Sequence, residues 1–358
     1  MSCLTAQLSG GRPFPLPVVS RPVPGRFPTT LLDFQQMFPN EEACIAYLEE
    51  LRWPEGFTCP ICASKDEPFR FANRPTVLRC RACRCNTRVT AGTVMNATRT
   101  PLQAWFWAAL LITTQMRGMS ALDLQRRVGI NRYETAFQML HKLRAAMVRP
   151  GPDKLGGRHI VEVDETVFGK QARGGGRSTH HMTTVVGAVE VPPDTPVGTQ
   201  RERKRQEHDR GRPVRGEIDA GRLFLRVIPN HGRLALASFM TDNVAKGTTI
   251  FTDNWHGYDQ LARLGYEHRS VTPGDGSERA DVLPVIHMVF SGLRAWLHKT
   301  HHGVGRQHLQ AYLNEYAFRF NQHLYSTGML NSLLGIGTHV ESPTYRALYD
   351  GKWRHSKL

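Results

Sequence analysis

The chain has 358 residues, 40% of them hydrophobic, so it is long enough for two or three globular domains and is not composed like a disordered protein. No stretch approaches 18 uninterrupted apolar residues and the amino terminus has no apolar signal-peptide core, so we expect no membrane span and a cytoplasmic location. The net charge of +15 favours a polyanionic partner. Nucleic acid is preferred to a membrane surface because no basic amphipathic helix stands out.

The sequence begins with a proline-rich leader, residues 1–30, which we expect to be disordered. A metal-binding domain is predicted over residues 31–98, where two C-x-x-C pairs lie with 17 residues between them. Four thiolates at this spacing are typical of a zinc ribbon, and disulfides are not favoured in an intracellular protein. The predicted Zn²⁺ ligands are Cys59, Cys62, Cys80 and Cys83.

Arginines are dense around these cysteines, which suits a ribbon laid against DNA phosphates, although a basic loop facing water would have a similar sequence. Arg81 and Arg84 flank Cys83 and are predicted DNA contacts. Cys85 lies just past the second pair and is interpreted as a bystander.

Residues 99–150 are predicted to be helical. Pro101 suits the first turn of an apolar helix, Ser120 is a helix cap, Gly129 marks a turn, and a longer helix is expected from Asn131. A short helix, a turn and a basic second helix are typical of a helix-turn-helix, but a hairpin that only packs would look similar. The basic residues of the second helix are Arg132, His141, Lys142 and Arg144, of which Arg132 and Lys142 are predicted DNA contacts.

From residue 157 the sequence indicates strands. Largely apolar stretches at 158–169, 183–191, 221–229 and 248–258 predict four strands, and 267–271 is expected to form a short fifth strand. A helix is expected at 234–245 after the third strand, another between the last two strands, and another at 284–303. This order indicates an α/β domain over residues 157–325, interrupted by a charged insertion at 191–217. Residues 326–358 are left as a C-terminal tail.

Two of these strands end on aspartate. If the first and fourth strands are neighbours, Asp164 and Asp253 meet at the sheet edge where open α/β sheets place their sites. Paired carboxylates can hold Mg²⁺ or Mn²⁺ against a phosphodiester, although aspartates also end strands merely as turn residues. Asp242 occurs in an identical Thr-Asp-Asn triplet, but within a helical stretch, so Asp253 is preferred.

The chain resembles the zinc-ribbon insertion-sequence transposases of the ISXO kind, which carry an RNase H-like catalytic domain with a mixed five-stranded sheet. The resemblance covers roughly residues 35 to 325 and rests on the two cysteine pairs, TAGTVMNATRTPLQAW, VEVDET, GTTIFTDNWHGY and LRAWLHKTHHGVGRQHLQAYLNEYAFRFN, in that order. It implies metal-dependent cleavage at the element's ends followed by strand transfer, with Asp164 and Asp253 as the first two catalytic positions.

The same resemblance places the third catalytic position on the helix after the fifth strand, with a basic residue seven positions further on. His287 and Arg294 fall there. A neutral histidine adds no negative charge and suits Mg²⁺ less well than a carboxylate. Glu315 is a fallback ligand, although Arg319 one turn later favours a structural ion pair.

Residues 170–181 combine glycines with basic side chains and are predicted to form a hairpin lip that grips the DNA backbone. Lys170, Arg173 and Arg177 are its predicted contacts. For the insertion at 191–217, DNA binding and simple solvation are equally favoured.

The preferred hypothesis is the transposase of a bacterial insertion sequence that binds double-stranded DNA, associates with the nucleoid, and acts as a homo-oligomer that brings two ends together. A weak or inactive DNA-binding remnant that regulates is one alternative. A metal-dependent nuclease that does not join strands is another.

Overall fold

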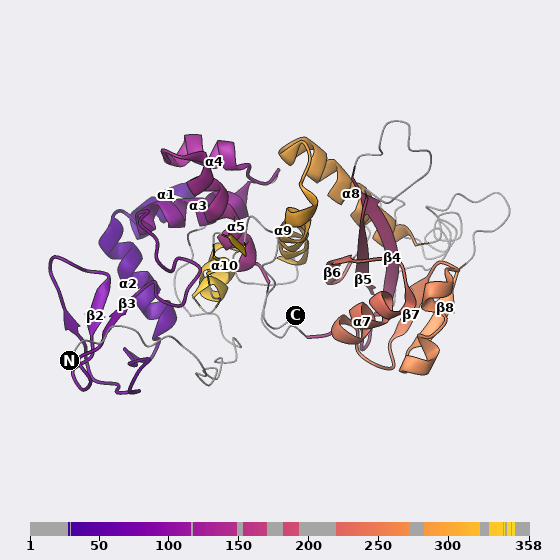
Figure 1. Ribbon diagram of the computed structural model, residues 1–358, viewed down its shortest axis with the longest axis horizontal. Helices are drawn as coiled ribbons and strands as arrows, with labels where there is room; N and C mark the ends of the chain where they lie inside the picture. Colours follow the sequence, from indigo (N-terminus) through magenta and orange to yellow (C-terminus); the bar gives the residue numbers. More distant parts are fainter. Residues whose placement is uncertain are drawn as a thin grey trace, which may run out of the picture. The chain divides into compact units, whose positions relative to one another are not determined.

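Figure 1 shows the computed structural model, which describes residues 28–148, 153–169, 182–192, 220–271, 283–322 and 329–347, apart from 29, 116, 339, 341 and 345. The chain divides into two compact units. The N-terminal unit comprises residues 1–148 with 327–348, and the C-terminal unit comprises 149–326 with 349–358. Most of the leader, the lip at 170–181 and nearly all of the insertion at 191–217 lie outside the described residues.

The N-terminal unit contains a small antiparallel sheet of β1 (Phe69–Arg70), β2 (Val77–Arg79) and β3 (Asn86–Arg88). One face buries Leu78 and Thr87 and carries Arg70, which pairs with Glu49 of α2 (Glu41–Arg52) at 2.8 Å. Arg52 of α2 also donates to the carbonyl oxygen of Arg88, at 3.0 Å. Contacts with α2 therefore hold this face of the sheet.

The helical part of this unit contains α1 (Leu31–Met37), α3 (Leu102–Thr114), α4 (Ala121–Val128), α5 (Tyr133–Ala145) and α10 (Met329–Gly337). The Ser120 side chain caps α4, and Gly129 ends it in the left-handed conformation, as the sequence predicts. Helix α5 begins after Arg132, later than expected. Helix α10, in the segment left as a tail, packs against α3 and α5.

The C-terminal unit contains a five-stranded sheet in the order β6-β5-β4-β7-β8. Its strands are β4 (Ile160–Phe168), β5 (Thr183–Val191), β6 (Leu223–Ile228), β7 (Thr249–Thr252) and β8 (Glu267–Ser270). The first three run antiparallel, while β7 and β8 run parallel to β4. This arrangement confirms the predicted mixed sheet and the predicted pairing of the first and fourth strands.

Helices cover both faces of this sheet, as Figure 1 shows. One core contains side chains of α8 (Pro284–His301) and α9 (Leu309–Asn321), and the other contains side chains of α7 (Arg233–Asn243). The prediction of a full helix between the last two strands is wrong. That connection has only two short 3-10 turns, His256–Tyr258 and Ala262–Leu264, and the left-handed Gly265 ends the second of them.

Side-chain amides of α9 satisfy the open edge of the sheet. Gln310 accepts from the backbone N–H of Val227 at 2.8 Å and donates to the carbonyl oxygen of Leu225 at 3.2 Å. Asn321 both accepts from and donates to the backbone of Leu223, at 2.7 and 3.0 Å. Because these backbone N–H and C=O groups are already hydrogen-bonded, this stretch of β6 cannot pair with a further strand.

Candidate functional site

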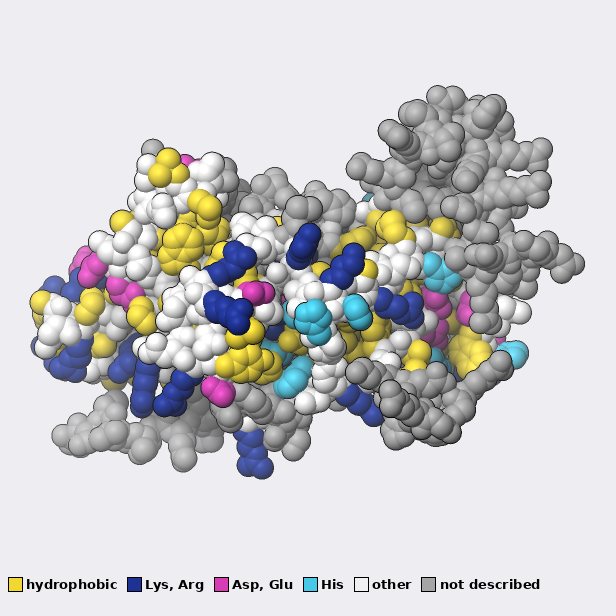
Figure 2. All heavy atoms as spheres, turned by 90° about the horizontal axis from the view of Figure 1, so that it is seen from above, with side chains coloured by type: hydrophobic (Ala, Val, Ile, Leu, Met, Phe, Trp, Pro, Cys, Tyr) yellow, Lys and Arg dark blue, Asp and Glu magenta, His cyan; other side chains and the backbone are white. Residues whose placement is uncertain are grey.

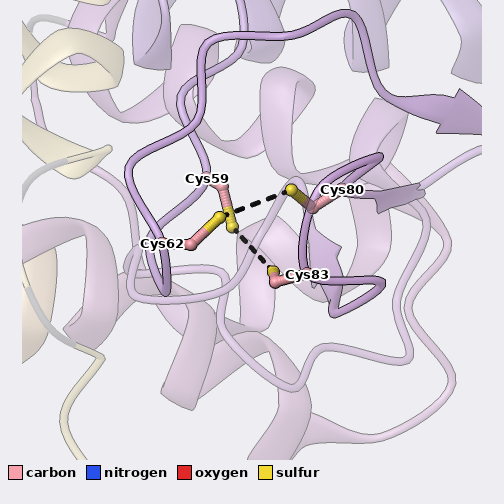
Figure 3. Close-up of side chains that lie close together, drawn as sticks. All are labelled: Cys59, Cys62, Cys80 and Cys83. Carbon is pink, nitrogen blue, oxygen red and sulfur yellow. Dashed lines mark hydrogen bonds between the residues drawn. The ribbon is translucent and has the colours of Figure 1, made fainter.

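The four predicted zinc ligands converge in the small sheet. Cys59 and Cys62 lie before β1, Cys80 and Cys83 lie after β2, and their sulfur atoms point toward one another (Figure 3). The Cys59–Cys83 and Cys62–Cys80 sulfur separations are both 3.6 Å. Tetrahedral Zn²⁺ with Zn–S bonds of about 2.3 Å needs sulfur separations of about 3.8 Å, so the donor set fits zinc in both chemistry and size.

Strand register brings Asp164 and Asp253 together. In the parallel pair β4–β7, Glu162 lies opposite Phe251, and the two aspartates lie two residues beyond that pair, on either strand. One carboxylate oxygen from each of Asp164, Glu165 and Asp253 lies within 4.8 Å of the others. The prediction that the first strand ends on Asp164 is wrong, because β4 continues to Phe168 through its pairing with β5. The structure therefore gathers three carboxylates where the end of β7 lies beside the middle of β4, and carboxylates are the donor type that Mg²⁺ and Mn²⁺ prefer.

Glu165 is the member of this group that sequence reasoning did not select. Its Oε2 accepts a hydrogen bond of 2.7 Å from the hydroxyl of Tyr258, which is fully buried. Its Oε1 is buried and has no hydrogen-bond partner among the described residues. Burial raises the pKa of Glu165 to about 7, and the charges of Asp164 and Asp253 act in the same direction. A divalent cation would relieve both the repulsion and the missing contact, so these residues fit a metal.

His287 lies beside this group, in the first turn of α8. Its Nε2 is 3.0 Å from Oδ2 of Asp164, and the pair is only partly exposed. The imidazole can therefore orient the Asp164 carboxylate as well as act as a ligand. Figure 2 shows acidic side chains gathered with a histidine over the unit that carries this sheet.

Glu162 fixes the start of α8, which has no side-chain cap of its own. It is only 2% exposed, and its Oε2 accepts from the backbone N–H groups of both Val285 and Ile286 at 2.9 Å. A carboxylate at a helix N-terminus satisfies unpaired donors and interacts favourably with the helix dipole. Because Glu162 and Asp164 are two residues apart on β4, this contact sets where His287 lies relative to Asp164.

Arg294 lies two turns further along α8 and, like the start of the helix, contacts β4. It donates to the Thr166 hydroxyl, and its guanidinium lies 5.7 Å from the centre of the Phe168 ring. Alternate residues of β4 thus contact α8, with Glu162 and Asp164 at its first turn and Thr166 two turns later. The cation is held at Thr166, two residues along β4 from Asp164, and it is exposed, so it can meet a ligand.

The contact of Glu162 with α8 gives a stability prediction. Replacing Glu162 with alanine removes both charged hydrogen bonds and leaves a cavity, so local stability at the start of α8 should fall by about 3 kcal/mol. Hydrogen exchange of the Val285 and Ile286 amides should then become roughly 100-fold faster, since each 1.4 kcal/mol is tenfold.

The exposed Glu267 of β8 provides the control. Glu267→Ala should leave exchange at the start of α8 unchanged. Unchanged protection of Val285 and Ile286 in Glu162→Ala would contradict the role given to Glu162.

The rival carboxylates lie elsewhere. Asp242 on α7 forms an ion pair of 2.7 Å with Arg226 and is not in the acidic group. Glu315 is fully buried on α9 and is likewise not among the grouped carboxylates of the described chain. Its charge acts on Arg319 one turn later, where burial lowers the pKa of the guanidinium.

The outer face of the small sheet carries arginines stacked on aromatic rings. Arg81 and Arg84 lie 4.3 and 5.3 Å from the centre of the Phe69 ring. Arg79 and Arg74 lie 5.1 and 5.6 Å from that of Phe71. Figure 2 shows Lys and Arg side chains at the end of the N-terminal unit that carries this sheet. Stacking holds these cations outward in a fixed arrangement that suits phosphate oxygens.

The basic side chains of the helical hairpin divide into two groups. Arg132 is exposed, and Lys142 is half-buried, with its pKa lowered by burial. His141 and Arg144 are buried, and Arg144 donates to the carbonyl oxygen of Met119 at 3.3 Å, so these two belong to the core. Lys170, Arg173 and Arg177 lie outside the described residues.

Comparison with known proteins gives matches to two family models. Residues 154–321 match the ISXO2-like transposase domain, and residues 39–86 match the transposase zinc-ribbon domain. The chain is also 25% identical, over 304 residues, to a protein of Halobacterium salinarum described as an uncharacterized protein in transposable element ISH50. That alignment covers 79% of this chain and 91% of the relative. Within the described part of the chain, no helix combines the length and apolarity needed to cross a membrane.

Proposed function

Because the chain belongs to the ISXO2-like transposase family, we propose that it is the transposase of an insertion sequence, binding the terminal inverted repeats, cleaving at the ends and joining them to target DNA. The observation that carries this proposal is the convergence of Asp164 and Glu165, in the middle of β4, with Asp253, directly after β7. A set of carboxylates, with an exposed arginine held two residues further along β4, suits the binding of divalent metal and phosphodiester together.

In this proposal Asp164 and Asp253 hold Mg²⁺ or Mn²⁺, and Glu165 supplies a third carboxylate within reach. When bound, the metal activates the attacking oxygen and stabilises the leaving one. His287 acts from the third catalytic position by holding the Asp164 carboxylate through its 3.0 Å contact, and it can also serve as a ligand. Arg294 binds the DNA backbone next to the reacting phosphate.

A strand-transfer assay tests the proposal. Purified full-length protein would be incubated with Mg²⁺ or Mn²⁺, labelled duplex carrying the element's terminal repeat, and a target plasmid. We expect joined product. Cleavage without joining would favour a nuclease, and tight binding without cleavage in either metal would favour a DNA-binding remnant.

We propose that the ribbon and the helical hairpin recognise the terminal repeats. Arg81 and Arg84 of the ribbon and Arg132 and Lys142 of the hairpin would contact the DNA. Both ribbon arginines belong to the zinc-binding loop of Cys80 and Cys83, so the metal would place them. Because two ends must be brought together, we expect the active form to be a homo-oligomer on DNA.

The ribbon arginines give a prediction about salt dependence. Replacing both Arg81 and Arg84 with alanine should weaken binding to terminal-repeat DNA and to unrelated duplex alike. Each lost phosphate contact makes the negative slope of log K against log salt shallower by about 0.9. The slope measured for the double variant should therefore be shallower than that of the wild type by about 2. Fluorescence anisotropy from 50 to 200 mM salt measures this slope.

Lys65 is the matched control, since it lies on the same ribbon in an exposed pair with Glu55 at 3.7 Å. Lys65→Ala should leave the slope nearly unchanged. An unchanged slope in the double variant would mean that this face of the ribbon does not contact phosphates.

A further inference from the structure

An exposed indole lies next to the acidic group. Trp255 is 48% exposed and lies two residues past Asp253. Its backbone N–H donates to Oδ1 of Asp253 at 3.2 Å, so the residue is tied to the carboxylate itself. Any phosphate held at Asp253 would therefore have the Trp255 indole as a close neighbour.

The indole is held by one edge. Its Nε1 donates to the carbonyl oxygen of His231 at 3.3 Å. The same edge lies against the bare backbone of Gly257, where an added Cβ would come within 2.7 Å of Cδ1 and Nε1. Fixing the ring by its edge leaves much of it in solvent, and a ring already fixed loses little conformational entropy when a ligand packs on it.

A flat aromatic surface beside a phosphate site fits a nucleobase. Every base has a face that can stack on an indole, and such stacking does not require a particular sequence. We propose that Trp255 stacks on a nucleobase adjacent to the scissile phosphate, an inference that rests on the proposed transposase function. Inside a duplex the base faces are covered by neighbouring bases, so the stacked base must leave the helix at or near the cleavage site.

This contact gives the enzyme a way to select element ends. Unstacking a base costs a few kcal/mol in an intact duplex and less where the duplex is distorted or frayed. Stacking on Trp255 offsets that cost only when a base is present and free to turn out. The contact would thus favour DNA that opens at the scissile position.

The test is a double-mutant cycle between protein and DNA. Dissociation constants would be measured without added divalent metal, using full-length protein and terminal-repeat duplexes with single abasic sites across the three nucleotides on each side of the cleavage site. In all of these duplexes the six nucleotides are left unpaired, so that no unstacking cost masks the stacking contribution. At one position, removal of the base should weaken wild-type binding about tenfold. Trp255→Ala should cost about the same on intact DNA, and combining both changes should cost no more than either alone.

Two further variants complete the design. Trp255→Phe keeps a stacking surface and should retain discrimination between intact and abasic DNA. Leu234→Ala removes an 86% exposed apolar side chain from α7 of the same unit and should leave all affinities unchanged.

Additive losses in the cycle would overturn the assignment, because Trp255 would then contact something other than that base. If the wild-type protein binds every abasic duplex with the same affinity as the intact one, the assignment is overturned as well, whether or not the alanine variant folds. A change of oligomeric state in Trp255→Ala with intact discrimination would assign the indole to a protein contact instead. Protein that joins ends but shows no coupling loses only the Trp255 assignment, whereas failure to bind or join the repeat refutes the proposed function itself.

Discussion

Replacing Asp253 with asparagine is expected to reduce strand transfer by on the order of 1,000-fold or more while leaving binding to the terminal repeat within about twofold. Asparagine keeps the size of the side chain and the Oδ1 atom that accepts from Trp255, so the loop after β7 should stay in place. It lacks the negative charge that holds a divalent cation beside Asp164 and Glu165. The loss should therefore fall on the chemical step rather than on DNA recognition.

Asp242 is the matched control. It occupies the middle of an identical Thr-Asp-Asn triplet but pairs with Arg226 on α7. Asp242→Asn should leave strand transfer within about threefold of wild type, since surface ion pairs contribute little. Mn²⁺ binding followed by calorimetry provides a readout independent of turnover, and it should weaken in Asp253→Asn alone. Normal joining by Asp253→Asn would refute the assignment of this aspartate.

Strand patterning was sufficient to predict how the sheet brings Asp164 and Asp253 together. Both residues follow apolar stretches, and parallel pairing of those stretches brings the two aspartates to the same level of the sheet, although β4 continues to Phe168. The cysteine spacing likewise predicted the grouping of four sulfurs. In each case a local sequence pattern predicts which side chains meet, because the backbone geometry of a strand pair or of a cysteine loop fixes their positions.

Other parts of the site depend on contacts that local patterns do not encode. Glu165 lies next to Asp164 in the sequence, but its place in the acidic group depends on a hydrogen bond from Tyr258, 93 positions later in the chain. Nothing in the sequence distinguishes Glu162 from an ordinary strand residue, because its role depends on Val285, 123 positions later in the chain. His141 and Arg144 were grouped with the exposed cations of the hairpin, yet tertiary packing buries both.

The position of Glu165 also bears on the histidine at the third catalytic position. A neutral His287 in place of a carboxylate would leave a two-aspartate site short of negative charge. The structure gathers a third carboxylate from the residue next to Asp164 and sets His287 against Asp164 instead. On this argument, Glu165→Gln should weaken Mn²⁺ binding more than His287→Ala does, which calorimetry on the two variants can measure.

Loss of the ribbon's zinc is expected to remove DNA recognition while leaving the C-terminal unit folded. Zinc contributes on the order of 10 kcal/mol to small ribbons, comparable with the whole stability of a domain. Cys80→Ser should therefore lower bound zinc from one ion per chain to none and abolish hydrogen-exchange protection in β1, β2 and β3. Terminal-repeat binding should weaken at least about tenfold, because Arg81 and Arg84 lose their support.

Cys85→Ser is the control, since Cys85 lies two residues from Cys83 but is not in the group of four sulfurs. It should keep one zinc per chain and wild-type affinity. The amides of β4 and β5 should stay protected in both variants, because their cores consist of side chains of the C-terminal unit. Retention of a full equivalent of zinc in Cys80→Ser would remove that cysteine from the ligand set. Loss of protection in β4 and β5 would show instead that the two units do not fold independently.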